Sequence, residues 1–342
     1  MAGPAVDCLA EVPKREDAPF RRVAPGRLGN ASPRASSSYG ALMRFGYWIN
    51  TSYPWADTLS TAQTAQQLGW DCLWYSDHFM PNAPEPADGV VNEAMTTLSA
   101  LASCVPMIRL GTIVLGNTYR HPALLANMAA TLDQISGGRF TLGLGAGWQE
   151  NEHAAYGMEM GTLKWRMNRF DETCEALNML FSQNRTTFNG EHVKLADAPL
   201  DPKPVQSPLP LMVGGGGEKR TLKIVAKHAH QWNVWATPEL FSHKLAILES
   251  HCADIGRDPA TIDKTVAALL FLTDDQAFAD KLRARDLGRP AIIGNATEVA
   301  EQIRGYAELG VDEIIVPGFT FPNAAAAEPT LRAMIETVKP LL

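Results

Sequence analysis

The stretch Ile135–Gln149, with the sequence ISGGRFTLGLGAGWQ, decides the fold. At its centre, over residues 139–144, apolar residues alternate with others in the period of two that is typical of a β-strand. The strand follows a Gly-Gly turn and ends in three alternating glycines, Gly143, Gly145 and Gly147, with polar residues directly after them. Glycine allows another part of the backbone, or a flat ligand, to approach closely. This pattern alone fits either a strand bend packed on its neighbours or a ligand site.

On both sides of this stretch, segments with strand character alternate with segments of helical spacing. The predicted strands are Met43–Ile49, Cys72–Tyr75, Ile108–Leu115, Phe140–Leu144, Leu211–Val213, Gln231–Trp235, Thr265–Leu272 and Glu313–Val316. The predicted helices are Trp55–Leu68, Asn92–Val105, Pro122–Ile135, Arg166–Phe181, Glu218–His228, Pro238–Ile255, Thr297–Leu309 and Glu328–Leu341. This alternation predicts an α/β fold of the (β/α)8 TIM-barrel type. The alternative is an open doubly wound sheet, which favours a glycine-containing phosphate loop after the first strand, whereas residues 50–54 contain no glycine.

Two segments depart from the alternation. Residues 185–195 predict a β-hairpin around the turn Asn189-Gly190, and a proline-rich connector follows, so we expect an insertion before the fifth strand. Residues 1–42 contain many prolines and few apolar residues, which predicts a flexible N-terminal extension, and they lack the apolar core of a secretion signal. Residues 43–342 are then the barrel domain.

The composition excludes several classes of protein. The 342 residues carry a net charge of −7 without a long basic run, which argues against nucleic-acid binding. No apolar run approaches the roughly 20 residues that a membrane span needs. The five cysteines are scattered and form no C-x-x-C pair, so a zinc site or disulfide framework is not expected and a cytoplasmic location fits best.

Residues whose side chains or backbone can take part in catalysis or ligand binding follow the predicted strands, where a barrel enzyme builds its site. Asp77 and His78 come directly after the second strand, and this position favours His78 as an acid, a base or a hydrogen-bond donor over a satisfied core histidine. Gly214, Gly215, Gly216 and Gly217 follow the fifth strand and precede two cations, an arrangement that suits a phosphate, although a tight turn is the alternative. No metal-ligand spacing or nucleophile elbow is present, which indicates an organic cofactor that performs redox chemistry.

The sequence resembles the bacterial luciferase-like family of flavin and deazaflavin oxidoreductases. The matching pieces occur in the family's order and are MRFG at 43–46, LWYSDHF at 73–79, RLGTIV at 109–114, YRHPALLA at 119–126, ISGGRFTLGLGAGW at 135–148, GGGGEKRTL at 214–222 and GVDEIIV at 310–316. Together they cover nearly all of residues 43–342 and are specific as a set. The branch that the chain is most similar to depends on coenzyme F420.

The resemblance implies a cofactor ring over the carboxyl ends of the strands. His78 would lie near the reactive carbon of the ring and Asp77 would help to orient the site. The residues expected at the cofactor are Thr112, Ile113 and Val114, which match a bulge that contains a non-prolyl cis peptide in relatives, Asn151, and Gly214, Gly215 and Gly216 at the phosphate. Trp148 and Trp232 are expected to lie near the ring and to line the substrate pocket.

Two positions depart from the family pattern. Trp148 stands where F420-dependent glucose-6-phosphate dehydrogenases have a glutamate acid, which argues for a more apolar substrate. His230 and Gln231 replace the usual Asp-Gly before Trp232. The leading hypothesis is hydride transfer between F420 and a small organic substrate. The alternatives are an FMN-dependent monooxygenase that uses oxygen, and a flavin-binding barrel without turnover. Analogy with the family also predicts a homodimer.

Overall fold

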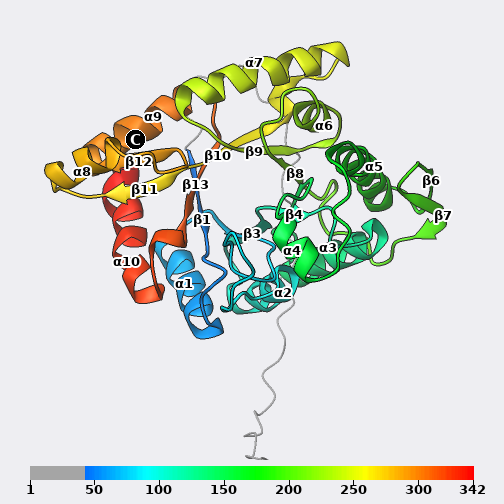
Figure 1. Cartoon of the computed structure of the whole chain (residues 1–342), viewed down its shortest axis with the longest axis horizontal. Coiled ribbons are helices and arrows are strands. Elements are labelled where there is room, and N and C mark those ends of the chain that lie inside the picture. Colours follow the sequence, from blue (N-terminus) through cyan, green and yellow to red (C-terminus); the bar gives the residue numbers. More distant parts are fainter. Residues whose placement is uncertain (1–42) are drawn as a thin grey trace, which may run out of the picture. The chain divides into compact units, whose positions relative to one another are not determined.

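Strands and helices alternate along residues 43–342, which are the part of the chain that the computed structural model describes (Figure 1). The barrel strands are β1 (Arg44–Trp48), β2 (Cys72–Tyr75), β3 (Arg109–Thr112), β4 (Leu115–Gly116), β5 (Phe140–Gly145), β8 (Leu211–Gly214), β9 (Gln231–Trp235), β10 (Asp263–Ala267) and β13 (Glu313–Pro317). The helices around them are α1 (Trp55–Leu68), α2 (Ala94–Cys104), α3 (Pro122–Ser136), α5 (Leu163–Ser182), α6 (Thr221–His228), α7 (Pro238–Asp254), α9 (Ala296–Glu308) and α10 (Ala324–Ala333). The expectation of a flexible extension concerns residues 1–42, which lie outside the described residues.

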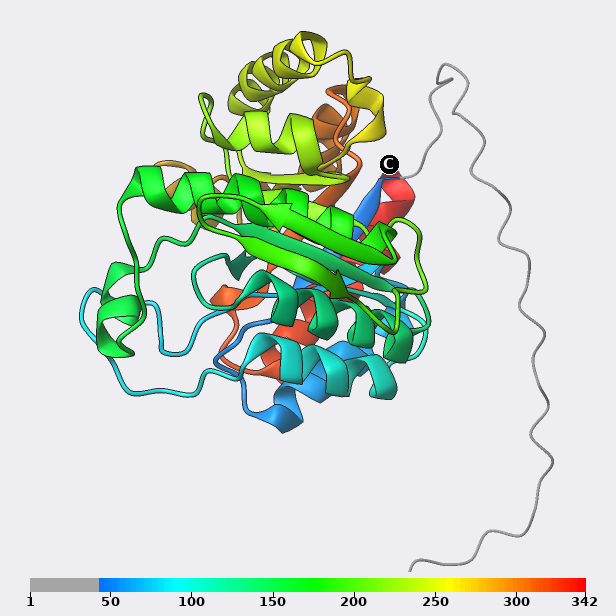
Figure 2. The same ribbon diagram turned by 90° about the vertical axis from the view of Figure 1, so that its right-hand side faces the viewer.

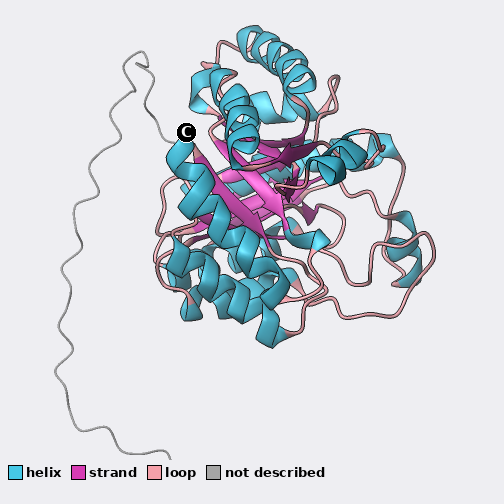
Figure 3. Ribbon diagram, turned by 90° about the vertical axis from the view of Figure 1, so that its left-hand side faces the viewer, coloured by secondary structure: helices cyan, strands magenta, loops and turns pink. Residues whose placement is uncertain are grey.

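Parallel pairing closes the sheet on itself. Its strands follow the order β3-β2-β1-β13-β10-β9-β8-β5-β4, and β3 also pairs with β5. Since β3 and β4 are two parts of one barrel strand, the closed sheet has eight strand positions, and helices surround it on the outside (Figure 3). This arrangement confirms the predicted (β/α)8 barrel and excludes the open doubly wound sheet.

Local chemistry sets the ends of the helices. Glu93 caps α2 by accepting hydrogen bonds from the backbone of Met95 and Thr96. Pro122 occupies the first turn of α3, and Gly137 ends that helix with a left-handed φ of 67°. No helix within residues 43–342 is both long and apolar enough to cross a membrane.

The core has two layers. The larger layer lies between the strands and the helices and includes Phe140, Leu142 and Leu144 of β5. The smaller layer fills the barrel interior, where the Trp74 indole donates a hydrogen bond of 2.7 Å to the buried Glu313 carboxylate. Gly46 and Gly111 flank this indole, and a Cβ atom on either would lie within 2.5 Å of it. The barrel is therefore closed by side chains below its carboxyl-terminal mouth.

The structure adds elements outside the barrel sheet. Strands β6 (Arg185–Asn189) and β7 (Lys194–Pro199) form an antiparallel hairpin between α5 and β8, where the sequence predicted one, and it lies on the outer side of α5 (Figures 1 and 2). The prediction of one strand over 265–272 was wrong. The chain leaves the barrel after Ala267, and β11 (Leu269–Leu272) pairs instead with β12 (Ala291–Gly294), with α8 (Gln276–Arg283) between them.

Three predicted helix starts also differ. Helix α5 begins at Leu163 rather than Arg166, because the Thr162 side chain caps it. Helix α6 begins at Thr221 rather than Glu218, because residues 218–220 form turns. Helix α10 begins at Ala324, four residues before the predicted start, where the Asn323 side chain caps it. A short helix that the sequence did not predict, α4 (Glu150–Ala155), follows β5 and shapes the candidate site.

Candidate active site

His78 and Glu152 meet at the mouth of the barrel. His78 follows β2, Glu152 lies in α4, and the His78 Nδ1 atom is 3.3 Å from Glu152 Oε2. The Glu152 side chain is fully buried, whereas the His78 side chain keeps 20% of its surface exposed. The other Glu152 oxygen accepts hydrogen bonds from the backbone N–H groups of Phe79 at 2.5 Å and Met80 at 3.2 Å. This carboxylate therefore holds the segment after β2 and the His78 ring in one place.

The state of Glu152 fixes which nitrogen of His78 carries a proton. Burial opposes ionisation of Glu152, but hydrogen bonds from His78, Tyr119 and the Phe79 backbone outweigh it and lower the pKa of this carboxyl group. An ionised carboxylate can only accept, so His78 Nδ1 must donate to it. The neutral His78 ring then presents an unprotonated Nε2, which can take up and return a proton.

A second histidine, His153, packs against Tyr119, which is a hydrogen-bond partner of Glu152. Tyr119 donates a hydrogen bond from its hydroxyl to Glu152 Oε2, and burial together with this acceptor raises the pKa of Tyr119. The Tyr119 ring stacks on His153, with 4.7 Å between the ring centroids. His153 lies 2.7 Å from the Gln149 carbonyl through Nδ1 and 2.6 Å from the Thr118 hydroxyl through Nε2, so its ring is fixed on both sides.

Asp77 is buried and held by polar partners. Its fully buried carboxylate forms a bidentate pair with Arg120, at 2.7 and 2.9 Å, and accepts a hydrogen bond from the backbone of Gly116 at 3.0 Å. Arg120 also contacts Glu93, the cap of α2. No part of the carboxylate reaches the open face, and the role of Asp77 in orienting the site stays a prediction. Asp77 and His78 do not pair with each other.

The predicted bulge lies between β3 and β4. The Ile113–Val114 peptide bond is cis, within the segment where the resemblance implied a non-prolyl cis peptide. The Thr112 hydroxyl bridges to Gly143, donating to its carbonyl at 2.8 Å and accepting from its N–H at 2.7 Å. A Cβ atom on Gly143 would lie 1.9 Å from the Thr112 carbonyl oxygen, so this glycine serves the close approach of two backbones.

Val114 lies between two glycines at the mouth. A Cβ atom on Gly145 would lie 2.7 Å from one Val114 methyl group, and a Cβ atom on Gly214 would lie 2.8 Å from the other. The absence of side chains at these two glycines gives Val114 its place at the ends of β5 and β8. Gly145 and Gly214 therefore shape an apolar floor rather than a polar contact.

The glycines after β8 divide into two groups. Gly214 packs against Val114, and Gly215 adopts a φ of +122° while its N–H donates to the Asn233 carbonyl at 2.9 Å. Of the four glycines, Gly216 and Gly217 have amide groups for which residues 43–342 provide no backbone acceptor, so they are candidates for an anion. Glu218 follows these glycines, and the nearby ammonium group of Lys244 is paired with its carboxylate, at 2.5 Å.

Trp232 does not line a pocket, which corrects the sequence prediction. It is completely buried in the layer between barrel and helices, stacked on Phe241 of α7 with 5.6 Å between centroids. Its indole N–H donates to the Gly215 carbonyl at 2.9 Å, so it supports the glycine segment from outside the barrel. Side chains alternate along β9, and Trp232 therefore faces away from the interior that Asn233 faces.

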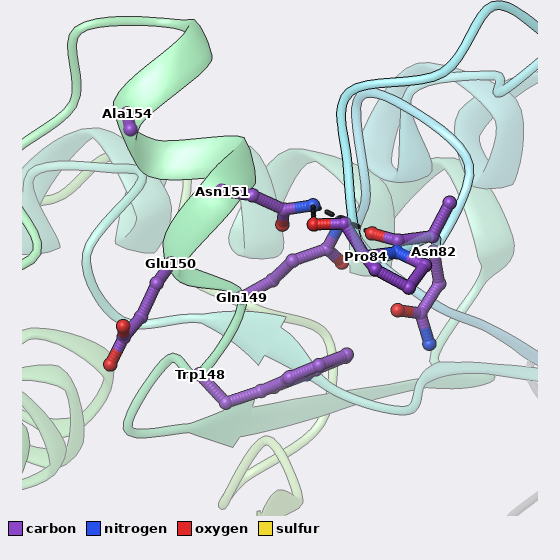
Figure 4. Close-up of a pocket in the computed structure, with 8 residues that line it drawn as sticks. Asn82, Pro84, Trp148, Gln149, Glu150, Asn151 and Ala154 are labelled. Carbon is purple, nitrogen blue, oxygen red and sulfur yellow. Dashed lines mark hydrogen bonds between the residues drawn. The ribbon is translucent and has the colours of Figure 1, made fainter.

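An open pocket of about 690 Å³, a size that suits a ligand, is lined by residues of the 82–84 loop and of the segment 148–154, and His78 is not among its lining residues. Trp148 lines it, is 57% exposed, and contacts the His78 ring edge to face with 5.6 Å between centroids. Asn151 also lines it, but its amide donates to the carbonyl groups of Ala83 at 2.6 Å and Pro84 at 3.2 Å. Figure 4 shows this amide directed at the 82–84 loop, with the Trp148 ring below it in that view. Asn151 thus holds the pocket rim, and its cofactor contact stays a prediction.

Sequence reasoning missed Glu152 as the partner of His78. The family signal around residue 148 stopped just before α4, and a separation of 74 residues along the chain hides the pair. The side-chain amides of Asn117 and Gln149 are buried and have no hydrogen-bond partner within residues 43–342. Buried amides without partners are uncommon and mark a place where a ligand or water completes the structure.

The fold and this site define a class of protein. The family model described as luciferase-like monooxygenase matches residues 37–287, and the chain belongs to this family. Among curated proteins, the chain is 34% identical over 174 residues to an F420-dependent glucose-6-phosphate dehydrogenase of Amycolatopsis mediterranei, a match that covers 51% of this chain and spans half the length of that relative. It is 29% identical over 289 residues to the protein of the same name from Kineococcus radiotolerans, covering 74% of this chain and 84% of the relative.

A solved structure supports the fold independently. An F420-dependent secondary alcohol dehydrogenase, in complex with an F420–acetone adduct, superposes with a TM-score of 0.76 at 20% identity. The match covers 88% of this chain and 99% of that protein. At this level of identity the likeness shows the barrel alone.

Proposed function

We propose that this protein is an oxidoreductase that uses the deazaflavin F420 to transfer a hydride to or from a small organic substrate. The observation that carries the proposal is the His78–Glu152 pair, which presents one ring nitrogen at the mouth of a luciferase-like barrel. The F420-dependent relatives support the choice of cofactor.

The residues at the mouth fit such a cofactor. A cofactor with a flat ring and a phosphate needs an apolar floor and an anion cradle. Val114, packed between Gly145 and Gly214, offers the floor. The amide groups of Gly216 and Gly217 offer the cradle. The unpartnered amides of Asn117 and Gln149 are available for polar atoms of a ring.

The chemistry divides between the cofactor and the chain. When bound, F420 supplies the hydride acceptor or donor. Glu152 keeps the proton of His78 on Nδ1, so Nε2 accepts a proton from an alcohol being oxidised or, when protonated, gives one to a carbonyl group being reduced. The Trp148 ring packs against the His78 ring and limits its movement at the mouth.

Trp148 also bears on the substrate. The family resemblance implies that F420-dependent glucose-6-phosphate dehydrogenases have a glutamate acid at this position, where this chain has an apolar ring. We infer a substrate more apolar than a sugar phosphate, with His78 as the side chain that exchanges a proton with it. The chain is also predicted to form a homodimer, by analogy with the family.

Titration of the purified protein with oxidised F420 and, separately, with FMN tests the cofactor. Trp148 lies at the mouth, so binding should quench tryptophan fluorescence. Micromolar F420 binding with much weaker FMN binding supports the proposal. The reverse result refutes it and favours the alternative, an FMN-dependent monooxygenase, for which oxygen uptake is the next assay.

A second experiment tests turnover. His78→Ala should bind F420 as the wild type does but lose F420 reduction by a pool of small alcohols by about 10²-fold or more. His192→Gln, a change on the outer hairpin, is the matched control and should keep full activity. A wild-type protein that binds F420 yet turns over no alcohol or carbonyl compound would favour a barrel without catalysis.

A further inference from the structure

Three aromatic side chains gather at the mouth on the ends of different strands. Trp48 is the last residue of β1, Trp235 is the last residue of β9, and Phe319 follows β13. The Trp48 ring centroid is 5.8 Å from that of Trp235 and 4.7 Å from that of Phe319. Phe319 is 44% exposed, whereas Trp48 is buried beneath it. These three residues form an aromatic wall, open to solvent at Phe319.

A cation lies on this aromatic wall. The Arg289 guanidinium carbon is 5.1 Å from the centroid of the Trp235 ring. Arg289 is exposed and has no acidic partner within residues 43–342. It is supplied by the chain between α8 and β12, part of the segment outside the barrel sheet. A guanidinium stacked on an aromatic ring keeps its N–H donors free at the edge, where a carboxylate can meet them.

One hydrogen-bond donor within the aromatic wall is left unused. The Trp48 indole N–H is buried and has no partner in the described chain. By contrast, the buried indoles of Trp70, Trp74 and Trp232 donate to Leu331, Glu313 and Gly215, respectively. Because buried indole N–H groups usually find an acceptor, Trp48 differs from a residue that only fills the core.

The aromatic wall is continuous with the proposed cofactor floor. Trp48 and Trp235 belong to the same interior apolar cluster as Ile113 and Val114, with Met212 beside them. A planar molecule on this wall would therefore lie next to a cofactor ring supported by Val114. Such a position is the one that hydride transfer between two stacked partners requires.

We propose that Trp48, Trp235, Phe319 and Arg289 form a substrate subsite for a planar, conjugated organic acid. The aromatic wall stacks on the flat carbon skeleton, and Arg289 pairs with the carboxylate. This inference rests on the proposed function and names its substrate class. It agrees with the apolar ring of Trp148 at the other side of the mouth.

Equilibrium binding of 2-naphthoate tests the subsite, with 2-naphthalenemethanol as the uncharged analogue. The readout is the ¹⁵N-indole signals of the full-length protein, assigned with Trp→Phe variants, without F420 and with it. Naphthoate should shift the signals of Trp48 and Trp235 and leave Trp165, which packs against the outer hairpin, unchanged. Arg289→Ala should weaken naphthoate binding about tenfold or more and leave binding of the alcohol unchanged.

Arg285→Ala is the matched control, because Arg285 is an exposed arginine of the same segment with no aromatic contact, and it should bind naphthoate as the wild type does. The proposal is overturned if naphthoate leaves the Trp48 and Trp235 signals in place, or if Arg289→Ala binds it as tightly as the wild type. The F420 titration reports the proposed function separately. Naphthoate binding without any F420 binding would support the proposed subsite and refute F420 as the cofactor.

Discussion

Replacing Glu152 with glutamine tests the logic of the site most directly. All four groups around the Glu152 carboxylate are donors, namely the backbone N–H groups of Phe79 and Met80, the Tyr119 hydroxyl and His78 Nδ1. A glutamine has the same shape but offers one acceptor oxygen and one NH₂ group. We expect its oxygen to face the two backbone groups and its NH₂ group to face His78, which then moves its proton to Nε2.

The magnitudes follow from these contacts. Hydrogen bonds to a charged group contribute about 1.5–3 kcal/mol and neutral ones about 0.5–1.5 kcal/mol, so Glu152→Gln should lower the free energy of unfolding by about 2 kcal/mol at pH 7 after the carboxylate's burial cost is relieved. Glu152 has a lowered pKa in the folded state, so its stabilisation is present above the unfolded value of about 4.3 and is lost as the pH falls through the folded pKa. The stability difference between wild type and variant should therefore shrink below about pH 4.

Turnover should change more than stability. With the proton on Nε2, neutral His78 cannot accept another there, and we expect about 10²–10⁴-fold slower alcohol oxidation with F420 affinity nearly unchanged. Urea unfolding, ¹⁵N-histidine spectra and steady-state rates measure the three effects. Tyr119→Phe is the control, since it removes one donor and leaves the pair of Glu152 and His78 in place. Wild-type turnover in Glu152→Gln, or a proton still on Nδ1, would refute the reasoning.

Three further predictions concern the frame of the site. Gly143→Ala should destabilise the fold by about 3 kcal/mol or prevent folding, because its Cβ would meet the Thr112 carbonyl oxygen at 1.9 Å; urea unfolding measures this, and an unchanged midpoint would contradict it. Arg120→Met should cost about 3–5 kcal/mol by leaving Asp77 buried without its cation, with recovery when Asp77→Asn is added; a stable single variant would show that the pair is dispensable. Trp232→Phe removes one hydrogen bond to the glycine segment and should weaken F420 binding up to tenfold without a change in FMN discrimination, as measured by fluorescence titration; unchanged affinity would disconnect the indole from the cradle.

Much of the fold follows from local patterns. Alternation of apolar residues located β5, and Pro122 and Gly137 marked the two ends of α3 almost to the residue. The run over 265–272 failed for a non-local reason. The apolar residues before and after Ala268 both suit a strand. The two strands differ in their pairing partner, since β10 pairs with β13 and β11 pairs with β12. No local signal in the run reports which strand it will pair with.

The sequence located site residues that directly follow a strand, but it did not show contacts between residues that are far apart along the chain. The position of His78 after an apolar strand was enough to single it out. Its partner Glu152 comes from a helix of six residues, too short for a periodic pattern. Trp232 was misplaced although the sequence held the clue. The period of two puts it on the face opposite to Asn233, toward Phe241 and the helices.

The strand pair β11–β12 gives the barrel a separable part. Its main chain bonds to itself, with Leu269 N–H donating to the Pro290 carbonyl at 2.8 Å and Thr273 N–H donating to the Gly294 carbonyl at 2.9 Å. The chain from 274 to 289 can therefore change in length or composition while every barrel strand keeps its neighbours. Exchange of this one segment between relatives therefore offers a route, in evolution or in protein engineering, to a new substrate specificity. The proposed cofactor site on the barrel strands would stay unchanged.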